Sequence, residues 1–154
     1  SYQLLRSAQD YWLAGKPLAL DLSKQGLGSH HFPGKRLTNL SFGLARAEAL
    51  PFAAETQEVV CSSFLLDRVE EPKLALAEMY RVLRPGGRMI LVTPLNFQQA
   101  AHWAAYFPSE KLKEVMKEIG FQIIAWQEDL RVEEPLDQRG NFITWRGVGV
   151  AAEK

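Results

Sequence analysis

Hydrophobic residues recur along this chain in short unbroken runs and in longer segments of helical spacing. Residues 2–13 carry the amphipathic pattern of a helix, and Gly15 and Pro17 follow it as a stop signal. The apolar run at 18–22 predicts a short buried strand. Residues 23–38 are rich in Gly, Ser, His and Lys, so we expect mostly loop or a broken helix there.

The middle of the chain repeats the signals for strand, turn and helix. Residues 40–45 predict a second strand and 49–52 a turn, and the contiguous β-branched start of 58–65 is typical of a strand covered on both faces. Apolar residues at helical spacing predict a helix over 71–83. The string Arg-Pro-Gly-Gly at 84–87 has a structural role, because proline and paired glycines turn the chain sharply out of the helix.

The last third contains the clearest helix of the chain. After a strand at 89–93, residues 94–106 are rich in aromatic side chains and are expected to be helical in part. Residues 109–120 combine charges at i,i+4 spacing with a glycine where a left-handed cap belongs. Two closing strands follow at 121–127 and 142–151, with a polar stretch between them.

This order of elements defines a fold class. Strands that alternate with helices favour a largely parallel sheet with helices on both faces, so the class is α/β. The two closing strands have no helix between them, which predicts an antiparallel pair at one edge of the sheet.

Composition narrows the function classes. A chain of 154 residues is about one domain, and its 18 basic residues balance its 18 acidic ones, so nothing indicates a nucleic-acid surface. The longest apolar stretch is far shorter than the ~18–20 residues of a membrane span. The single cysteine, Cys61, allows no internal disulfide, and the adjacent His30 and His31 point apart, so no metal site is predicted. We therefore expect a reduced, cytoplasmic domain.

Several strings, at a characteristic order and spacing, carry a family resemblance. They lie at 48–52, 58–66, 69–72, 77–88 and 118–121. Together they resemble class I S-adenosylmethionine-dependent methyltransferases, and particularly the type 11 group of small-molecule methyltransferases. The resemblance covers the whole chain. It implies a Rossmann-like fold whose seven-stranded sheet has an antiparallel last strand, with S-adenosyl-L-methionine as cofactor and S-adenosyl-L-homocysteine as product.

The resemblance implies a set of cofactor-binding residues near the first two strands. Asp21 ends the first strand, where a carboxylate can accept hydrogen bonds from two ribose hydroxyls. Leu22 and Ser23 would border the adenine edge, with simple packing as the alternative. Ala47 would offer its backbone amide to a ring nitrogen. Arg46 stands where relatives carry an acidic residue, and because arginine only donates hydrogen bonds it cannot replace that acceptor.

Further site residues are expected elsewhere along the chain. Glu48 is the neighbouring carboxylate that can substitute for the missing acidic residue at the adenine, and Ser62 and Ser63 follow the strand that lines the methyl-transfer site in the family. Asp67 and Arg68 replace a common histidine pair. They are candidates for a base and for a group that binds an anionic substrate, with a surface ion pair as the alternative.

The aromatic segment is the candidate substrate-binding region. Asn96, His102 and Trp103 lie where relatives insert a segment that covers the substrate, and ordinary core or lid packing is the alternative. Neutral charge and this aromatic cluster favour a small organic methyl acceptor over nucleic acid.

The family's glycine-rich cofactor loop, and the strand that leads into it, would fall immediately before Ser1. We therefore interpret 1–154 as a single methyltransferase domain that is incomplete at its N-terminus. The chain is then a fragment of a longer enzyme, a domain whose first strand comes from a partner chain or a second copy in a homo-oligomer, or a degenerate module.

The expected function is methyl transfer to a small molecule, without nucleic-acid or membrane partners. The main alternative is a non-catalytic, methyltransferase-like binding or assembly module. A nicotinamide-dependent oxidoreductase shares the Rossmann logic, but the antiparallel closing pair and the Leu-Pro-Phe turn at 50–52 disfavour it.

Overall fold

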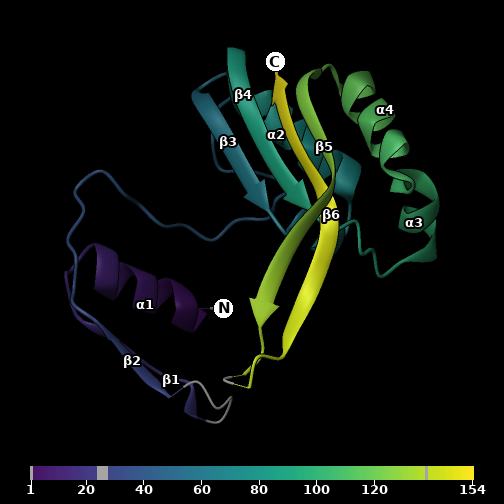
Figure 1. Ribbon diagram of the computed structural model, residues 1–154. Helices are drawn as coiled ribbons and strands as arrows, with labels where there is room; N and C mark the ends of the chain where they lie inside the picture. Colours follow the sequence, from purple (N-terminus) through teal and green to yellow (C-terminus); the bar gives the residue numbers. More distant parts are fainter. Residues whose placement is uncertain (1, 24–27, 138) are drawn as a thin grey trace. The chain divides into compact units, whose positions relative to one another are not determined.

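The computed structural model describes residues 2–23, 28–137 and 139–154 (Figure 1). The chain groups into two compact units. The first comprises Ser1–Leu44 and Glu134–Ile143, and the second comprises Ala45–Glu133 and Thr144–Lys154. The single domain expected over residues 1–154 stays a prediction.

The first unit contains a helix and a small sheet. Helix α1 (Tyr2–Trp12) and strand β1 (Leu18–Asp21) confirm the two elements expected at the start of the chain. However, β1 is largely exposed and pairs antiparallel with β2 (Ser29–Phe32). The expectation of loop or broken helix over 23–38 is therefore wrong for the residues of β2, because β1 satisfies their backbone groups.

The strand expected over residues 40–45 is not formed. The described backbone has no regular structure there, and Leu40 and Leu44 are both exposed. A strand needs a neighbouring strand to take its backbone hydrogen bonds, and among the described residues this segment has none.

The second unit is built on a sheet of four described strands in the order β3-β4-β6-β5. These are β3 (Gln57–Ser63), β4 (Leu83–Thr93), β5 (Gln122–Pro135) and β6 (Phe142–Glu153). Strands β3 and β4 are parallel, whereas β6 runs antiparallel to β4. The closing strands lie side by side and run in opposite directions, as expected (Figure 1).

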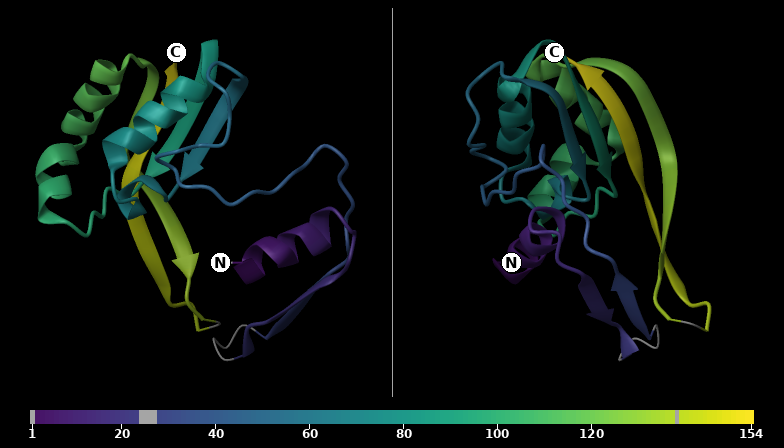
Figure 2. Two further views of the ribbon diagram at one scale, coloured as in Figure 1. Left: turned by 180° about the vertical axis from the view of Figure 1, so that it is seen from behind. Right: turned by 90° about the vertical axis from the view of Figure 1, so that its left-hand side faces the viewer.

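Three helices form a layer against this sheet. They are α2 (Pro72–Val82), α3 (Ala100–Tyr106) and α4 (Ser109–Ile119). Helix α4 contacts both α2 and α3, and α2 lies across β3 and β4 when the molecule is seen from behind (Figure 2). All three helices confirm sequence expectations.

Helical spacing places one face of α2 in the core. Ala75, Leu76, Met79 and Val82 are buried at i, i+1, i+4 and i+7. They pack against the side chains of β4 on the sheet face that α2 covers. Met89 and Leu91 on this face are fully buried. Burial of each large side chain contributes about 1.5–3 kcal/mol, so this interface stabilises the second unit.

The Arg-Pro-Gly-Gly string is confirmed as a structural element, although it belongs to β4 rather than to a separate turn. Helix α2 ends at Val82, and the register against β3 then shifts between Gln57 and Val59, so the string bulges out of the ladder. A Cβ atom on Gly87 would lie 2.8 Å from the Arg84 carbonyl oxygen. Glycine is therefore required by this close backbone approach.

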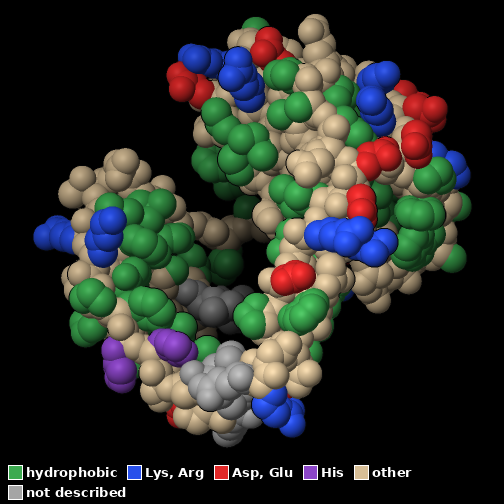
Figure 3. All heavy atoms as spheres, viewed as in Figure 1, with side chains coloured by type: hydrophobic (Ala, Val, Ile, Leu, Met, Phe, Trp, Pro, Cys, Tyr) green, Lys and Arg blue, Asp and Glu red, His purple; other side chains and the backbone are tan. Residues whose placement is uncertain are grey.

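The sheet face opposite the helices is open within the second unit. Val59 and Ile90 on β3 and β4 are 52% and 49% exposed, and Cys61 between them is exposed as well. Figure 3 shows hydrophobic side chains gathered on this face. The expectation of helices on both faces is thus not met within this unit. No helix in the described part of the chain is long and apolar enough to cross a membrane.

Strand β6 approaches the end of β4 very closely at Gly147. A Cβ atom there would lie 2.2 Å from the carbonyl oxygen of Thr93 and 2.7 Å from the Cα atom of Pro94. Both opposing atoms belong to the backbone, so no rotamer change relieves the clash. This contact holds β6 against the carboxyl end of β4.

We predict that Gly147→Ala destabilises the protein by at least about 1–3 kcal/mol, the usual cost of overpacking. Gly149→Ala on the same strand is the matched control, because its Cβ would meet Leu130 Cδ2 at an ordinary 3.5 Å. Urea unfolding of both variants measures the difference. Equal midpoints for the two variants would contradict the close approach.

Candidate functional site

The carboxyl ends of β3 and β4 define one edge of the sheet. The two strands are parallel, so the residues after Ser63 and after Thr93 leave the sheet on the same side. Open α/β sheets bind ligands at this edge. A short 3-10 helix, η2 (Leu66–Arg68), follows β3 here, and the segment that begins at Pro94 follows β4.

Two predicted site residues at this edge carry buried polar atoms without partners. Ser62 is 6% exposed and Asp67 is 3% exposed, and neither the serine hydroxyl nor either carboxylate oxygen has a hydrogen-bond partner among the described residues. The nearest cation is Arg68, whose Nε lies 3.5 Å from Asp67 Oδ2. Burying polar groups without hydrogen-bond partners costs about 1–3 kcal/mol each, which marks this edge as a place with unused hydrogen-bonding capacity. Ser63, by contrast, is exposed.

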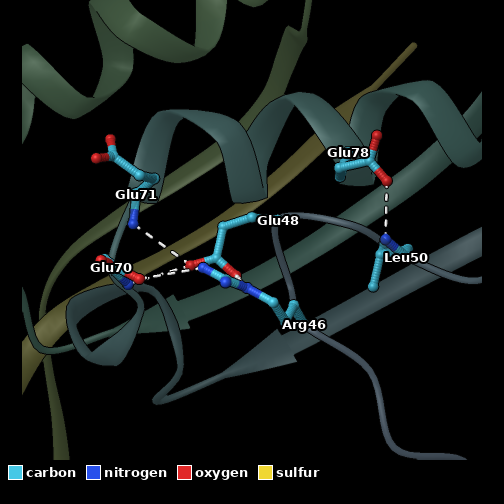
Figure 4. A network of polar contacts seen from close by, with 6 residues as sticks. All are labelled: Arg46, Glu48, Leu50, Glu70, Glu71 and Glu78. Atoms are coloured by element: carbon cyan, nitrogen blue, oxygen red, sulfur yellow. Dashed lines mark hydrogen bonds and ion pairs between the residues drawn. The ribbon is translucent and has the colours of Figure 1, made fainter.

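Glu48 is engaged with the start of helix α2 (Figure 4). Its Oε1 accepts hydrogen bonds from the backbone amides of Glu70 at 3.1 Å and Glu71 at 3.4 Å. Glu71 is the N-cap residue of α2, so the carboxylate satisfies amides that the helix leaves unpaired and lies where the helix dipole favours negative charge. Arg46 makes ion pairs with Glu48 at 3.7 Å and Glu70 at 3.1 Å.

A second glutamate fixes the same loop farther along the helix. Oε2 of Glu78 accepts a hydrogen bond from the backbone amide of Leu50 at 2.8 Å (Figure 4). Arg81 donates to Glu78 and also to the carbonyl of Leu50. The strings at 48–52 and 77–88 are therefore joined to one another, which gives them a structural role beside any role in the site.

Asp21, Leu22 and Ser23 belong to the first unit. Asp21 Oδ1 accepts hydrogen bonds from the hydroxyl and the backbone amide of Ser23 and, more weakly, from the Ser29 hydroxyl. The hydroxyl of Ser23, followed by its amide, lowers the pKa of Asp21 below the ordinary 3.8. The side chain is thus an ionised acceptor at a strand end, which is the chemistry that ribose hydroxyls need.

The aromatic segment forms one cluster in α3 and its flanks. His102 makes edge contacts with Phe97 and Tyr106, and the indole nitrogen of Trp103 donates to the Phe97 carbonyl at 2.6 Å. Trp103 also lies edge-on to Phe107 at 5.0 Å between ring centroids. Asn96 is exposed at the start of this segment.

A cavity of about 370 Å³ opens beside this cluster in the second unit. Its lining comes from the segment after β4, the start of α4, and the strands β5 and β6. The lining residues are Pro94, Leu95, Phe107, Pro108, Ser109, Glu110, Glu128, Asp129, Arg146, Gly147 and Val148. None of these residues was among the predicted site residues, because the cavity forms only where four separate segments meet. In the sequence, the one pattern that could have pointed to this cavity was the consecutive acidic pair Glu128 and Asp129, which directly follows the apolar strand expected at 121–127.

The sequence profile of the methyltransferase domain family matches residues 4–91, which is more than half of the chain. The chain belongs to this family. This confirms the family resemblance that the strings indicated.

Two curated relatives of this chain carry names that refer to quinones. A demethylmenaquinone methyltransferase of Renibacterium salmoninarum is 42% identical over 86 residues, which cover 55% of this chain and 35% of the relative. A ubiquinone/menaquinone biosynthesis C-methyltransferase of a Marinomonas species is 37% identical over 86 residues, which cover 56% and 30%. The chain spans about a third of the length of these relatives.

Solved structures show the fold. A SAM-dependent methyltransferase from Methanosarcina mazei matches with a TM-score of 0.53 and 19% identity, over 79% of this chain and 68% of that one. A methyltransferase in complex with its Trm112 activator, from Haloferax volcanii, matches with a TM-score of 0.54 and 17% identity, over 76% and 62%. The expected α/β class I methyltransferase fold is thereby confirmed.

S-adenosyl-L-methionine is the cofactor of this fold family, and the acceptors in the chain suit it. The family's cofactor offers ribose hydroxyls, an adenine amino group and an ammonium as donors. In the first unit, ionised Asp21 is an acceptor. In the second unit, the unpartnered oxygens of Ser62 and Asp67 can accept hydrogen bonds. The individual roles of the predicted site residues stay predictions.

We predict that Glu48→Ala lowers the free energy of unfolding by about 1 kcal/mol, the usual cost of a lost helix cap. Glu70→Ala is the control. It removes an exposed ion pair worth about 0–1 kcal/mol and keeps the capped amide. Urea unfolding followed by circular dichroism compares the two, and a larger loss for Glu70→Ala would contradict this role of Glu48.

The contribution of Glu48 also predicts a pH dependence. Its own backbone amide lowers the pKa of Glu48, burial opposes this, and the amides of Glu71 and Glu70 and the charge of Arg46 lower it further. Because the folded-state pKa lies below the unfolded value, the stabilisation is complete above about pH 4.5 and is lost as pH falls through the folded-state pKa. The difference in stability between the unsubstituted protein and Glu48→Ala should therefore shrink from about pH 7 to about pH 3. A constant difference over this range would contradict the prediction.

Proposed function

We propose that this chain carries part of the machinery of an S-adenosylmethionine-dependent methyltransferase that modifies a small-molecule acceptor. The observation that carries the proposal is the carboxyl edge of β3 and β4, where buried acceptors without donors lie in a chain of this family. The cellular location that fits this proposal is the cytoplasm.

The cofactor-binding side of the proposed site consists of the residues expected from the family resemblance. Asp21 would accept from the ribose hydroxyls, with Leu22 and Ser23 beside the adenine. Ala47 and Glu48 would lie at the adenine, and Ser62 and Ser63 at the end of β3. Glu48 already accepts hydrogen bonds from the amides of Glu70 and Glu71, just before α2, so its contribution to cofactor binding would be to hold this loop in place rather than to contact the adenine.

Bound S-adenosylmethionine supplies an electrophilic methyl group on a sulfonium. The chain then has to hold the nucleophile of the methyl acceptor in line and keep water out, and it needs a base only if that nucleophile must lose a proton. Of the two candidates, Arg68 has a half-exposed side chain that can reach an anionic group, whereas the Asp67 side chain is fully enclosed. We assign Asp67 the positioning of Arg68, 3.5 Å away.

The names of the two relatives refer to quinones, whereas the family match of this chain ends at residue 91. The cavity at the end of β4 is lined by residues 94–148, all beyond that point. Asn96, His102 and Trp103 lie in the same part of the chain, so the methyl acceptor is chosen by segments outside the shared region.

The decisive experiment is calorimetric titration of S-adenosylhomocysteine into the full chain. We expect micromolar binding that Asp21→Ala weakens at least about tenfold, because a hydrogen bond to a charged group contributes about 1.5–3 kcal/mol. Asp10→Ala is the matched control, since Asp10 is an exposed carboxylate that pairs with Lys16 in the same unit. It should leave the affinity unchanged.

Two results would overturn the proposal for this chain. One is a folded chain that does not bind S-adenosylhomocysteine, which would favour a non-catalytic binding module. The other is an equal loss of affinity in Asp21→Ala and Asp10→Ala, which would show that Asp21 has no specific role in cofactor binding. Circular dichroism spectra of each variant establish that it is folded.

A further inference from the structure

The cavity at the end of β4 has an apolar floor and a polar rim. Pro94, Leu95 and Val148 form apolar lining at the junction of β4 and β6, where Gly147 allows the two backbones to touch. Leu95 is buried and Val148 is 4% exposed, so both are fixed by the core beneath. A floor of this kind holds an apolar body by exclusion of water.

An aromatic side chain stands at the wall of the cavity. Phe107 is 50% exposed although it is a large hydrophobic residue, and its ring is held edge-on by Trp103. An exposed ring that is fixed by a neighbour offers a surface for a planar or cationic group. This arrangement connects Trp103, one of the predicted substrate-binding residues, to the cavity through Phe107.

The charged lining is predominantly acidic. Glu110, Glu128 and Asp129 contribute three carboxylates, and Arg146 is the guanidinium of the lining. Asp129 pairs with Arg146 at 3.8 Å and with Arg131, which lies outside the lining, at 2.9 Å, so the carboxylates outnumber the guanidiniums by three to two. Glu128 Oε1 accepts hydrogen bonds from the Ser109 hydroxyl at 2.9 Å and from the Trp126 indole at 3.2 Å, which fixes its position.

Glu110 lies in the first turn of α4, where its charge offsets the positive end of the helix dipole. With both arginines counted, the cavity still has one carboxylate in excess above its apolar floor. An anionic ligand would meet net repulsion there, and a cation would be attracted.

We propose that this cavity binds the methyl acceptor, and that the acceptor is an apolar, aromatic molecule that carries a protonated amine. The aromatic body lies on the floor and against Phe107, and the ammonium faces Glu128, with the arginine-paired Asp129 beside it. Calling the ligand the methyl acceptor rests on the proposed function. The cavity and its preference for a cation rest on the lining residues alone.

The test compares three probes of similar size on the full chain. These are 2-phenylethylamine, its neutral counterpart 2-phenylethanol and the anionic 3-phenylpropionate. Amide resonances followed by NMR report both affinity and location. We expect shifts centred on Leu95, Ser109, Glu128 and Val148, and binding of the amine at least about tenfold tighter than of the other two, with the preference weakened by added salt.

Substitutions identify the carboxylates responsible. Glu128→Gln and Asp129→Asn should each reduce amine affinity severalfold and leave the weak binding of the alcohol unchanged. Glu118→Gln is the matched control, because Glu118 lies at the other end of α4 and pairs with Lys73. Should either cavity variant fail to fold, the comparison of the three probes on the unsubstituted chain still decides.

Equal affinity for amine and alcohol would overturn the proposal in favour of neutral, quinol-like ligands, and tighter binding of the carboxylate would overturn it in favour of Arg146. Titration of S-adenosylhomocysteine separates this proposal from the proposed function. Amine binding without cofactor binding refutes only the proposed function, and cofactor binding without amine preference refutes only the proposed ligand.

Discussion

Burial of one sheet face beneath α2 and α4 is the interaction on which the second unit depends. The side chains of Leu76, Met89 and Leu91 are fully enclosed there, and the helices that enclose them also fix the loops at the carboxyl edge. The opposite face stays exposed within this unit, with Val59 and Ile90 half exposed. The rigid layer is thus one-sided, and the candidate site is built along the rim of that layer.

The strings that make the family recognisable have a physical basis in this layer. Glu48 accepts the amides at the start of α2, and Glu78 holds the backbone of Leu50 against the same helix. A recurrent glutamate in such a string is therefore explained by backbone hydrogen bonds before any ligand is invoked. Arg46, which departs from the family pattern, joins this network through its ion pair with Glu70.

The chain divides its chemistry between two regions. The part that matches the family contains the predicted cofactor residues from Asp21 to Ser63, whereas the cavity is lined entirely by residues 94–148. Conserving the first part while changing the second is a direct way for one fold to serve different methyl acceptors. The quinone chemistry of the relatives and the amine chemistry proposed here are therefore compatible with a common origin.

The sequence by itself determined the local elements whose signals are short in range. Helix α4 and its cap Gly120 follow from spacing and charge, because they depend on neighbours within a few residues. The Pro-Gly-Gly string marked the end of α2, although it forms a bulge within β4 rather than the expected turn. Only the tertiary structure decided what depends on distant partners. It paired β2 with β1, left residues 40–45 without a strand, and brought Phe107, Asp129 and Val148 together around one cavity. Strand pairing and cavity lining both depend on contacts between segments that are far apart in the sequence. No local pattern of residues encodes where such segments will meet.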